Sequence, residues 1–228
     1  MIPIKDENPT ETVPVVTVAI ITANVLAFAY ELSLGQQGVT RLVMQMGVVP
    51  REMTAGGLNL SHSPTLMTSM FLHGGLLHLL GNMLYLWIFG NNIEDALGHV
   101  RFFVFYLLCG VAATALHVAM NPGSLKPVIG ASGAISGVLG AYLILYPRAR
   151  VWTIIIYFFL IRLIRVPAVV VLMIWILYQV LSAAVLSAYG PTDAGGVAVF
   201  AHIGGFAAGI VLLPLFLLGR KRRRRIRV

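Results

Sequence analysis

One serine in this chain has the sequence context of a nucleophile. Ser132 lies in the run Gly130-Ala131-Ser132-Gly133, directly before an apolar helical segment. The first N–H groups of a helix have no partners within the helix, and the helix dipole favours negative charge at that end. The position therefore suits acyl transfer, in which an oxyanion develops. The alternative is a packing face, because closely spaced Gly, Ala and Ser residues let membrane helices approach each other.

A histidine and two possible hydrogen-bond donors accompany this serine. His202 lies in Ala201-His202-Ile203-Gly204-Gly205, and histidine is the usual base that activates a serine. His78 and Asn82 are four residues apart, on one face of a predicted helix, and both side chains can donate to an oxyanion. Each also has a structural alternative, as a packing histidine or as an interhelical hydrogen-bonding group. The combination favours catalysis.

The remaining histidines and the cysteine favour structural roles. His73 precedes His78 by five residues and is predicted to fasten the preceding loop. We assign His62, His99 and His117 to loop, interface or packing positions. The single cysteine, Cys109, excludes an intrachain disulfide and a multi-cysteine metal site. We therefore expect neither a metal nor a cofactor.

The composition is that of a membrane protein. Of 228 residues, 58% are hydrophobic and 11% are charged, whereas about a quarter are charged in soluble domains. The mean hydropathy of +0.88 agrees with this. The net charge of +8 comes largely from the basic run at residues 220–227. Because the run directly follows an apolar segment, we interpret it as a topology determinant or a contact for anionic lipid, and not as a nucleic-acid-binding surface.

The apolar segments predict an all-α bundle of six membrane-spanning helices. We expect a polar tail at residues 1–14, a membrane domain at 15–218 and a basic tail at 219–228. The expected spans are residues 15–34, 75–98, 101–120, 132–146, 167–187 and 198–218. Residues 35–74 are too broken by Gly and Pro for a span and too apolar for a free linker, which predicts a membrane-embedded first outer loop.

The basic residues predict the orientation of these spans. Six spans place both termini on one side, and most Lys and Arg residues would share that side, against Arg41, Arg51 and Lys126 opposite. Both termini are therefore expected in the cytoplasm, in a multi-pass protein of a prokaryotic plasma membrane. Residues 132–146 cover only about 21 Å of a hydrocarbon core roughly 30 Å thick, so Ser132 is expected below the outer surface. Polar groups at that depth are expected to meet around a wet cavity.

Taken together, these residues resemble the rhomboid family of intramembrane serine proteases. The resemblance covers nearly the whole chain and rests on the runs around Ser132 and His202, with Gly209, and on His73, His78 and Asn82. It implies Ser132 as nucleophile and His202 as general base and then acid. It also implies an oxyanion site of Asn82, His78 and the Ser132 backbone N–H. The remaining motif residues, His73, Gly130, Gly133, Gly205 and Gly209, would support the site.

The resemblance also implies a substrate class, and rival functions remain. The implied activity cleaves single-span membrane proteins near the outer interface, without a cofactor. Ser136 stands where some family members have a stacking tyrosine, and Asp193 is the nearest carboxylate before His202 in the chain. One rival is a catalytically silent rhomboid-like protein that binds membrane clients. A transporter is the other, although the sequence has no inverted repeat. The sequence carries no signal for an oligomeric state.

Overall fold

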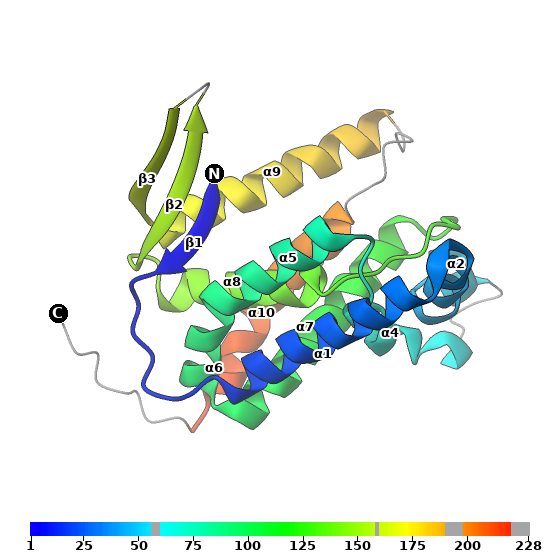
Figure 1. Ribbon diagram of the computed structural model, residues 1–228, viewed down its shortest axis with the longest axis horizontal. Coiled ribbons are helices and arrows are strands. Elements are labelled where there is room, and N and C mark those ends of the chain that lie inside the picture. The colour runs from blue at the N-terminus through cyan, green and yellow to red at the C-terminus, as the bar shows by residue number, and fades with distance from the viewer. Residues whose placement is uncertain (56–59, 158–159, 190–197, 220–228) are drawn as a thin grey trace.

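Long apolar segments form the helices of the bundle, because a backbone in lipid must satisfy its hydrogen bonds internally. The computed structural model describes residues 1–55, 60–157, 160–189 and 198–219 (Figure 1). Within these residues, four helices are long and apolar enough to cross a membrane: α1 Val15–Ser33, α7 His99–Met120, α9 Ala168–Tyr189 and α10 Val199–Leu217. The chain is therefore a multi-pass helical membrane protein.

The second expected span forms a helix, and a short helical segment meets it at a sharp angle from the N-terminal side. The span consists of α5 Leu76–Tyr85, the π-helical turn η3 Leu86–Gly90 and α6 Asn91–Leu97. The preceding helical piece, α4 Thr65–Thr68 with η2 Ser69–Phe71, makes an angle of 97° with it, so that the pair is a broken span or a re-entrant loop. Gly75 lies in the break with φ at 155°, a value that favours glycine.

The fourth expected span is shorter than the others. Helix α8, Ser132–Leu145, has 14 residues and begins at the serine of the Gly130-Ala131-Ser132-Gly133 run. Length and composition thus support four spans among the described residues, or five with the bent pair. Crossing by α8, and with it the count of six, remains a prediction.

The expected outer loop contains short helices. These are α2 Gly35–Met46, α3 Pro50–Thr54 and the 3-10 turn η1 Leu60–His62, followed by α4 and η2. Val48 pairs with Val128 in an isolated β-bridge, which ties this loop to the segment before Ser132. Its embedding in the membrane remains a prediction.

A small sheet corrects the all-α prediction. Strands β1 Ile2–Asp6, β2 Arg150–Tyr157 and β3 Leu160–Pro167 form an antiparallel sheet in the order β1-β2-β3. The β2–β3 hairpin lies between the expected spans 132–146 and 167–187, and β1 lies in the expected polar tail. The hairpin is rich in β-branched residues, which favour strands. The first strand gains backbone hydrogen bonds by pairing with β2.

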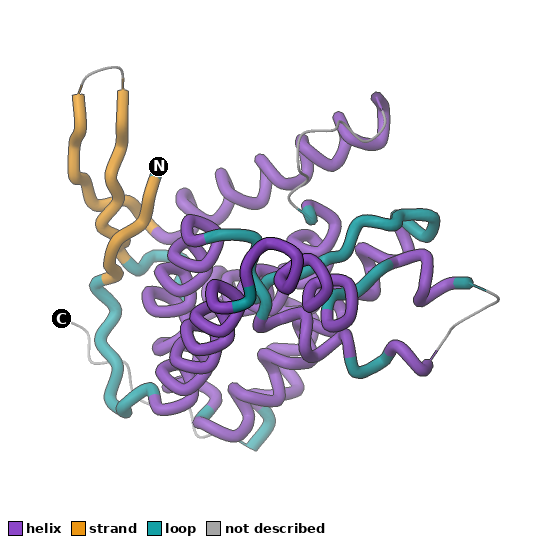
Figure 2. The backbone as a smooth tube through the Cα atoms, turned by 45° about the vertical axis from the view of Figure 1, so that its right-hand side comes forward, coloured by secondary structure: helices purple, strands orange, loops and turns teal. Residues whose placement is uncertain are grey.

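Polar contacts fasten the N-terminal strand to the bundle. The buried Asp6 carboxylate accepts hydrogen bonds from the Tyr142 hydroxyl at 2.6 Å and the Asn92 amide at 2.7 Å. Burial raises the pKa of the Asp6 carboxyl, and these hydrogen bonds offset only part of the increase. Glu7 pairs with Arg165 of β3 at 3.3 Å. The sheet therefore lies near the C-terminal end of α8 (Figure 1) and at one side of the helices (Figure 2).

The start of α7 and the end of α10 lie side by side. The Arg101 guanidinium donates hydrogen bonds to the carbonyl oxygens of Phe216 and Leu218, at 3.0 and 2.8 Å.

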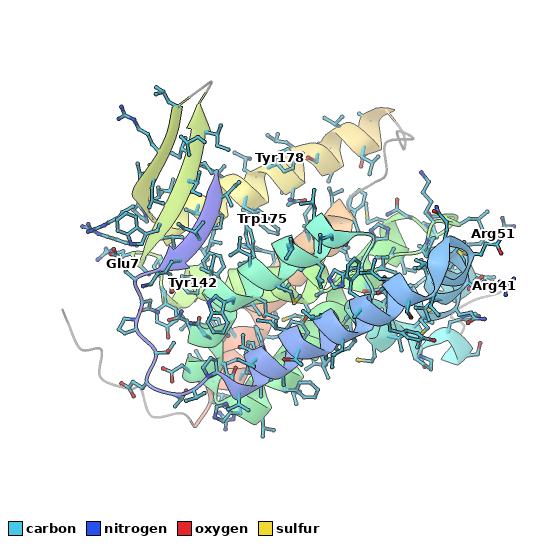
Figure 3. All side chains as sticks on the ribbon, in the orientation of Figure 1. Glu7, Arg41, Arg51, Tyr142, Trp175 and Tyr178 are labelled. Carbon is cyan, nitrogen blue, oxygen red and sulfur yellow. The ribbon has the colours of Figure 1, made fainter. Side chains whose placement is uncertain are left out.

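Arg41 and Arg51 lie at the opposite end of the bundle from Glu7 (Figure 3).

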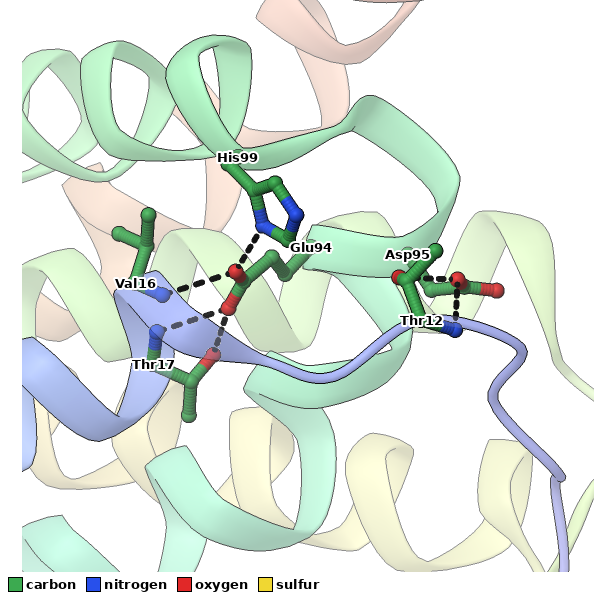
Figure 4. Close-up of polar contacts among 6 residues, drawn as sticks. All are labelled: Thr12, Val16, Thr17, Glu94, Asp95 and His99. Atoms are coloured by element: carbon green, nitrogen blue, oxygen red, sulfur yellow. Dashed lines mark hydrogen bonds and ion pairs between the residues drawn. The ribbon is translucent and has the colours of Figure 1, made fainter.

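A buried glutamate caps the first long helix. Glu94 of α6 is fully buried and accepts the backbone N–H groups of Val16 and Thr17 at 2.8 and 2.7 Å (Figure 4). It also accepts the Thr17 hydroxyl at 2.7 Å and lies 2.6 Å from His99 Nδ1. Because a helix N-terminus attracts negative charge, this carboxylate stabilises the start of α1 and joins it to α6 and α7.

Replacing this carboxylate is expected to weaken the bundle. Both carboxylate oxygens of Glu94 accept hydrogen bonds, and Glu94→Gln leaves only one acceptor oxygen. We expect the free energy of unfolding to fall by about 1–3 kcal/mol. We expect a lower midpoint of thermal unfolding for the detergent-purified protein. Asp95→Asn is the control, because Asp95 accepts from Thr12 in a less buried position. An unchanged midpoint for Glu94→Gln would contradict this role.

Candidate active site

Two glycine-bearing helices meet backbone to backbone at the site. A Cβ on Gly205 of α10 would clash with the carbonyl oxygen of Gly133 of α8. A Cβ on Gly209 would clash in the same way with the carbonyl oxygen of Gly137. The missing side chains let α8 and α10 touch along two turns, which sets how close Ser132 and His202 can come.

Ser132 is the first residue of α8 and is half-buried. The helix makes its first backbone bond from Ile135 to Ala131, at 3.0 Å, so the N–H groups before Ile135 precede the helical ladder. The serine borders a cavity of about 10 Å³, which is about the size of one water molecule. Residues from four other segments also line this cavity: Ser69, Thr114, Gly130 and Ala201. The hydroxyl thus lies beside a small, partly polar space at a helix N-terminus.

Gly130 brings His78 and Ser132 together. Its φ is 120°, which favours glycine, and its N–H donates to the Ser69 carbonyl at 2.8 Å. A Cβ here would lie 2.9 Å from His78 Nε2 and 3.7 Å from Ser132 Oγ. The imidazole and the hydroxyl therefore border the same point in space, and a side chain at residue 130 would displace the ring.

Asn82 lies one turn further along α5 from His78, on the same face. Its side chain is buried, and among the described residues its Nδ2 has no hydrogen-bond partner. A buried amide donor without a partner is costly in a folded protein. This arrangement leaves the Asn82 amide free to donate to a bound group.

His73 joins this face to the first helix. Its backbone N–H donates to the buried Glu31 carboxylate of α1 at 3.1 Å. Its ring packs against His78 edge to face, with 5.1 Å between ring centroids. His73 thus supports His78, and neither of its buried ring nitrogens has a partner among the described residues.

Two residues of α9 contact the His202 ring. The buried ring has Nδ1 at 3.0 Å from Gln179 Oε1. The Trp175 ring lies against it with 5.6 Å between centroids and 40° between planes. Figure 3 shows Trp175 between α9 and the bundle. Ser136 occupies the position at which some family members have a stacking tyrosine. Its hydroxyl donates a hydrogen bond to the Ser132 carbonyl oxygen at 2.6 Å.

The sequence analysis missed both α9 residues. Gln179 is the only amide side chain in α9, which otherwise contains serine and tyrosine hydroxyls among apolar residues, and Trp175 precedes it by one turn. An isolated amide in a membrane helix usually hydrogen-bonds to another helix. That signal was available, but it does not identify the partner.

Some expected contacts are not formed. Within the described part of the chain, no hydrogen bond joins the Ser132 hydroxyl to the His202 ring. Asp193 lies outside the described residues. No group of three or more His, Cys, Asp or Glu side chains in the described ranges is placed to hold a metal ion.

The sequence relatives identify the family. Residues 61–219 match the family model of the Rhomboid domain. This chain belongs to the rhomboid family. The match includes α5, α8, α9 and α10, the helices that carry Asn82, Ser132, Gln179 and His202.

Named relatives of this rhomboid come from plants, animals and bacteria. RHOMBOID-like protein 1 of Arabidopsis thaliana is 33% identical over 67% of this chain and 34% of its own length. Rhomboid protease GluP of Bacillus subtilis is 41% identical over 34% of this chain and 15% of its own. The mitochondrial presenilin-associated rhomboid-like protein of Bos taurus is 39% identical over 39% and 24%. The matched regions span about a third or less of these relatives.

The glycine contact is testable by overpacking. Gly205→Val places a branched side chain against the Gly133 carbonyl, and we expect a lower midpoint of thermal unfolding, because overpacking costs about 1–3 kcal/mol. Gly81→Val is the matched control, since a Cβ at this α5 glycine meets nothing within 4 Å. Equal midpoints for the two variants would show that α8 and α10 do not pack through Gly205.

Proposed function

We propose that this rhomboid is an intramembrane serine endopeptidase with Ser132 as nucleophile and His202 as general base. One observation carries the proposal: Ser132 begins a helix beside His78, and that helix packs through glycines against the helix bearing His202. A hydroxyl at a helix N-terminus with a histidine on the adjoining helix is an arrangement for acyl transfer.

The reaction follows from the roles of these groups. Ser132 Oγ attacks the scissile carbonyl carbon while His202 Nε2 takes the hydroxyl proton. The imidazolium then gives that proton to the leaving amine, which completes an acyl-enzyme. Water attacks the ester with His202 again as base, and Ser132 regains its proton. The missing hydrogen bond does not oppose this mechanism, because catalytic hydrogen bonds often tighten only in the substrate complex.

The oxyanion is assigned three donors. The Ser132 backbone N–H lies at the helix N-terminus, the His78 ring borders the same point as the serine hydroxyl, and the Asn82 amide has no partner among the described residues. Negative charge that develops on the carbonyl oxygen would be stabilised by such preorganised donors. The mechanism uses neither a metal nor a cofactor.

The substrate is proposed to be a single-span membrane protein. Its helix must unwind before a peptide bond can reach Ser132, because helical peptide groups are held in hydrogen bonds. We place the sheet end and both termini in the cytoplasm, on the distribution of Lys and Arg. The proposed anionic-lipid contact of the basic tail falls on residues 220–228, outside the described part. The comparisons do not support the expected prokaryotic plasma membrane, because named relatives include plant and mitochondrial proteins.

The second candidate is a silent rhomboid-like protein that binds membrane clients without cutting them. Among the relatives named above, only the name of GluP states protease activity. The pairing of Ser132 with His78 at a helix start favours the protease, because client binding alone does not need a positioned hydroxyl. No described feature favours a transporter.

Substitution of either proposed dyad member tests the activity. We expect Ser132→Ala and His202→Ala each to abolish cleavage of a model single-span substrate by the purified protein. The double variant should be hardly slower than either single variant, because nucleophile and base act as one unit. A chelator should leave wild-type turnover unchanged. Wild-type turnover in either single variant would exclude the dyad.

Substitution of an oxyanion donor is expected to slow turnover without abolishing it. Removal of one positioned donor lowers kcat about 10²–10³-fold, and we expect this for Asn82→Ala and for His78→Ala. The measurement is steady-state cleavage with kcat and KM resolved. If Asn82→Ala altered KM alone, the residue would bind substrate and would not stabilise the oxyanion.

The cleavage position tests the orientation. We expect the cut near the outward end of the substrate helix, close to Gly or Pro residues that lower the cost of unwinding. Mass spectrometry of both fragments locates the cut. A position at the cytoplasmic end would contradict the proposed orientation.

A further inference from the structure

Resting on the proposed protease function, we propose that Gln179 and Trp175 of α9 are positioning residues that set the tautomer and ring plane of His202. A serine protease triad uses a carboxylate to orient its histidine. Among the described residues, no carboxylate contacts the His202 ring, and an amide occupies that position instead.

The hydrogen bond determines which ring nitrogen carries the proton. Gln179 Oε1 lies 3.0 Å from His202 Nδ1, and a carbonyl oxygen can only accept. With the amide in this orientation, Nδ1 carries the hydrogen and donates it. Nε2 is left with a free lone pair, which is the form needed to take a proton from Ser132. With the amide turned over, its NH₂ would donate to Nδ1, and Nε2 would carry the hydrogen instead.

Trp175 limits the rotation of the ring. It precedes Gln179 by one turn, so both side chains leave the same face of α9. Its indole packs against His202 at 5.6 Å and against Phe206, one turn further along α10, at 6.1 Å between centroids. The indole thus packs against the imidazole, with 40° between the ring planes, and restricts its rotation.

An amide suits this environment. A carboxylate buried among membrane helices carries a desolvation cost that an amide avoids. Gln179 is buried, so an ionised group in its place would interact strongly with His202. An amide orients the imidazole but adds no negative charge to stabilise the imidazolium. This difference provides a test.

Three variants at neighbouring positions separate orientation from packing. Gln179→Met keeps the length of the side chain and removes the acceptor, and we expect kcat to fall about 100-fold with KM nearly unchanged. Gln179→Glu keeps an acceptor oxygen and adds charge. The acidic limb of its kcat/KM profile should move to higher pH, because a carboxylate favours the imidazolium. Tyr178→Leu, at an exposed position of α9, is the control and should match the wild type.

The readouts distinguish this inference from the proposed function. Wild-type turnover in Ser132→Ala would overturn the protease itself. If Ser132→Ala and His202→Ala are inactive while Gln179→Met keeps the wild-type kcat and pH profile, only the positioning role is overturned. Thermal midpoints report folding. If Gln179→Met does not fold, the pH profile of Gln179→Glu decides, and an unshifted acidic limb overturns the role.

A separate observation concerns the sheet, and we infer that the β2–β3 hairpin lies against an anionic bilayer surface. The hairpin projects from the bundle, and its distal part has no other described element against it (Figures 1 and 2). Ile156, Leu160, Ile161 and Leu163 on this part are each more than half exposed. By the strand register, Ile156, Ile161 and Leu163 share one face of the hairpin, and Leu160 lies on the other. Exposed aliphatic side chains that gather on one face mark an interaction surface.

The charge and position of the hairpin fit a lipid surface. Residues 147–167 contain four arginines and no acidic residue. Arg165 is half exposed, lies over the Trp152 ring at 4.5 Å and is paired with Glu7, directly after β1, whereas the other three arginines have no acidic partner within the hairpin sequence. Basic and aliphatic side chains together favour anionic lipid, and Trp favours the interface. The hairpin also joins two apolar helices, since α8 ends at Leu145 and α9 begins at Ala168.

Fluorescence tests the contact with lipid. An environment-sensitive label on Ile161→Cys would be specific, because the native Cys109 is fully buried. In vesicles that contain phosphatidylglycerol, we expect a blue-shifted emission and quenching by lipid-attached quenchers. A label on Gly123→Cys, in an exposed turn, is the control and should respond to aqueous iodide. Iodide quenching of the residue 161 label equal to that of the control would overturn the inference. Energy transfer between labels on two copies without quenching by lipid would also overturn it, in favour of pairing between β3 edges.

Discussion

The direct contact between the backbones of α8 and α10 is the constraint on which the site depends. Gly205 and Gly209 face the carbonyl oxygens of Gly133 and Gly137, with no room for a Cβ. Side chains cannot set a helix separation this small, whereas backbone atoms can. The catalytic and packing interpretations of the glycine motifs are therefore compatible. The same residues that pack the helices determine where the serine and the histidine lie.

The other helices complete the site from its two sides. From one side, α5 brings His78 to the point beside Ser132 that Gly130 leaves empty, and His73 anchors this face to α1. From the other side, α9 supplies Gln179 and Trp175 to the His202 ring. Contacts at the far end of the bundle fasten the remaining elements, chiefly the Glu94 cap. Helices α5, α8, α9 and α10 thus each have a defined part in the proposed chemistry.

The sequence predicted the membrane helices better than it predicted the contacts between distant segments. Motifs around Ser132 and His202 led to the rhomboid family because their spacing is local and characteristic. The hairpin was missed because a short apolar segment between spans does not distinguish a strand from a helix. The strand at Ile2–Asp6 forms by pairing with residues about 150 positions away, which no local pattern reveals. Gln179 was visible as the one amide side chain of α9, but its partner depends on how α9 packs.

Covalent labelling tests most directly whether Ser132 is an activated nucleophile. The purified protein would be treated with a fluorophosphonate, which reacts with serines activated by a neighbouring base, and the adduct located by mass spectrometry. We predict one adduct, on Ser132, that is lost in His202→Ala although this variant keeps its fold. An adduct on another residue, or labelling of Ser132 that is unaffected by His202→Ala, would contradict the proposed site.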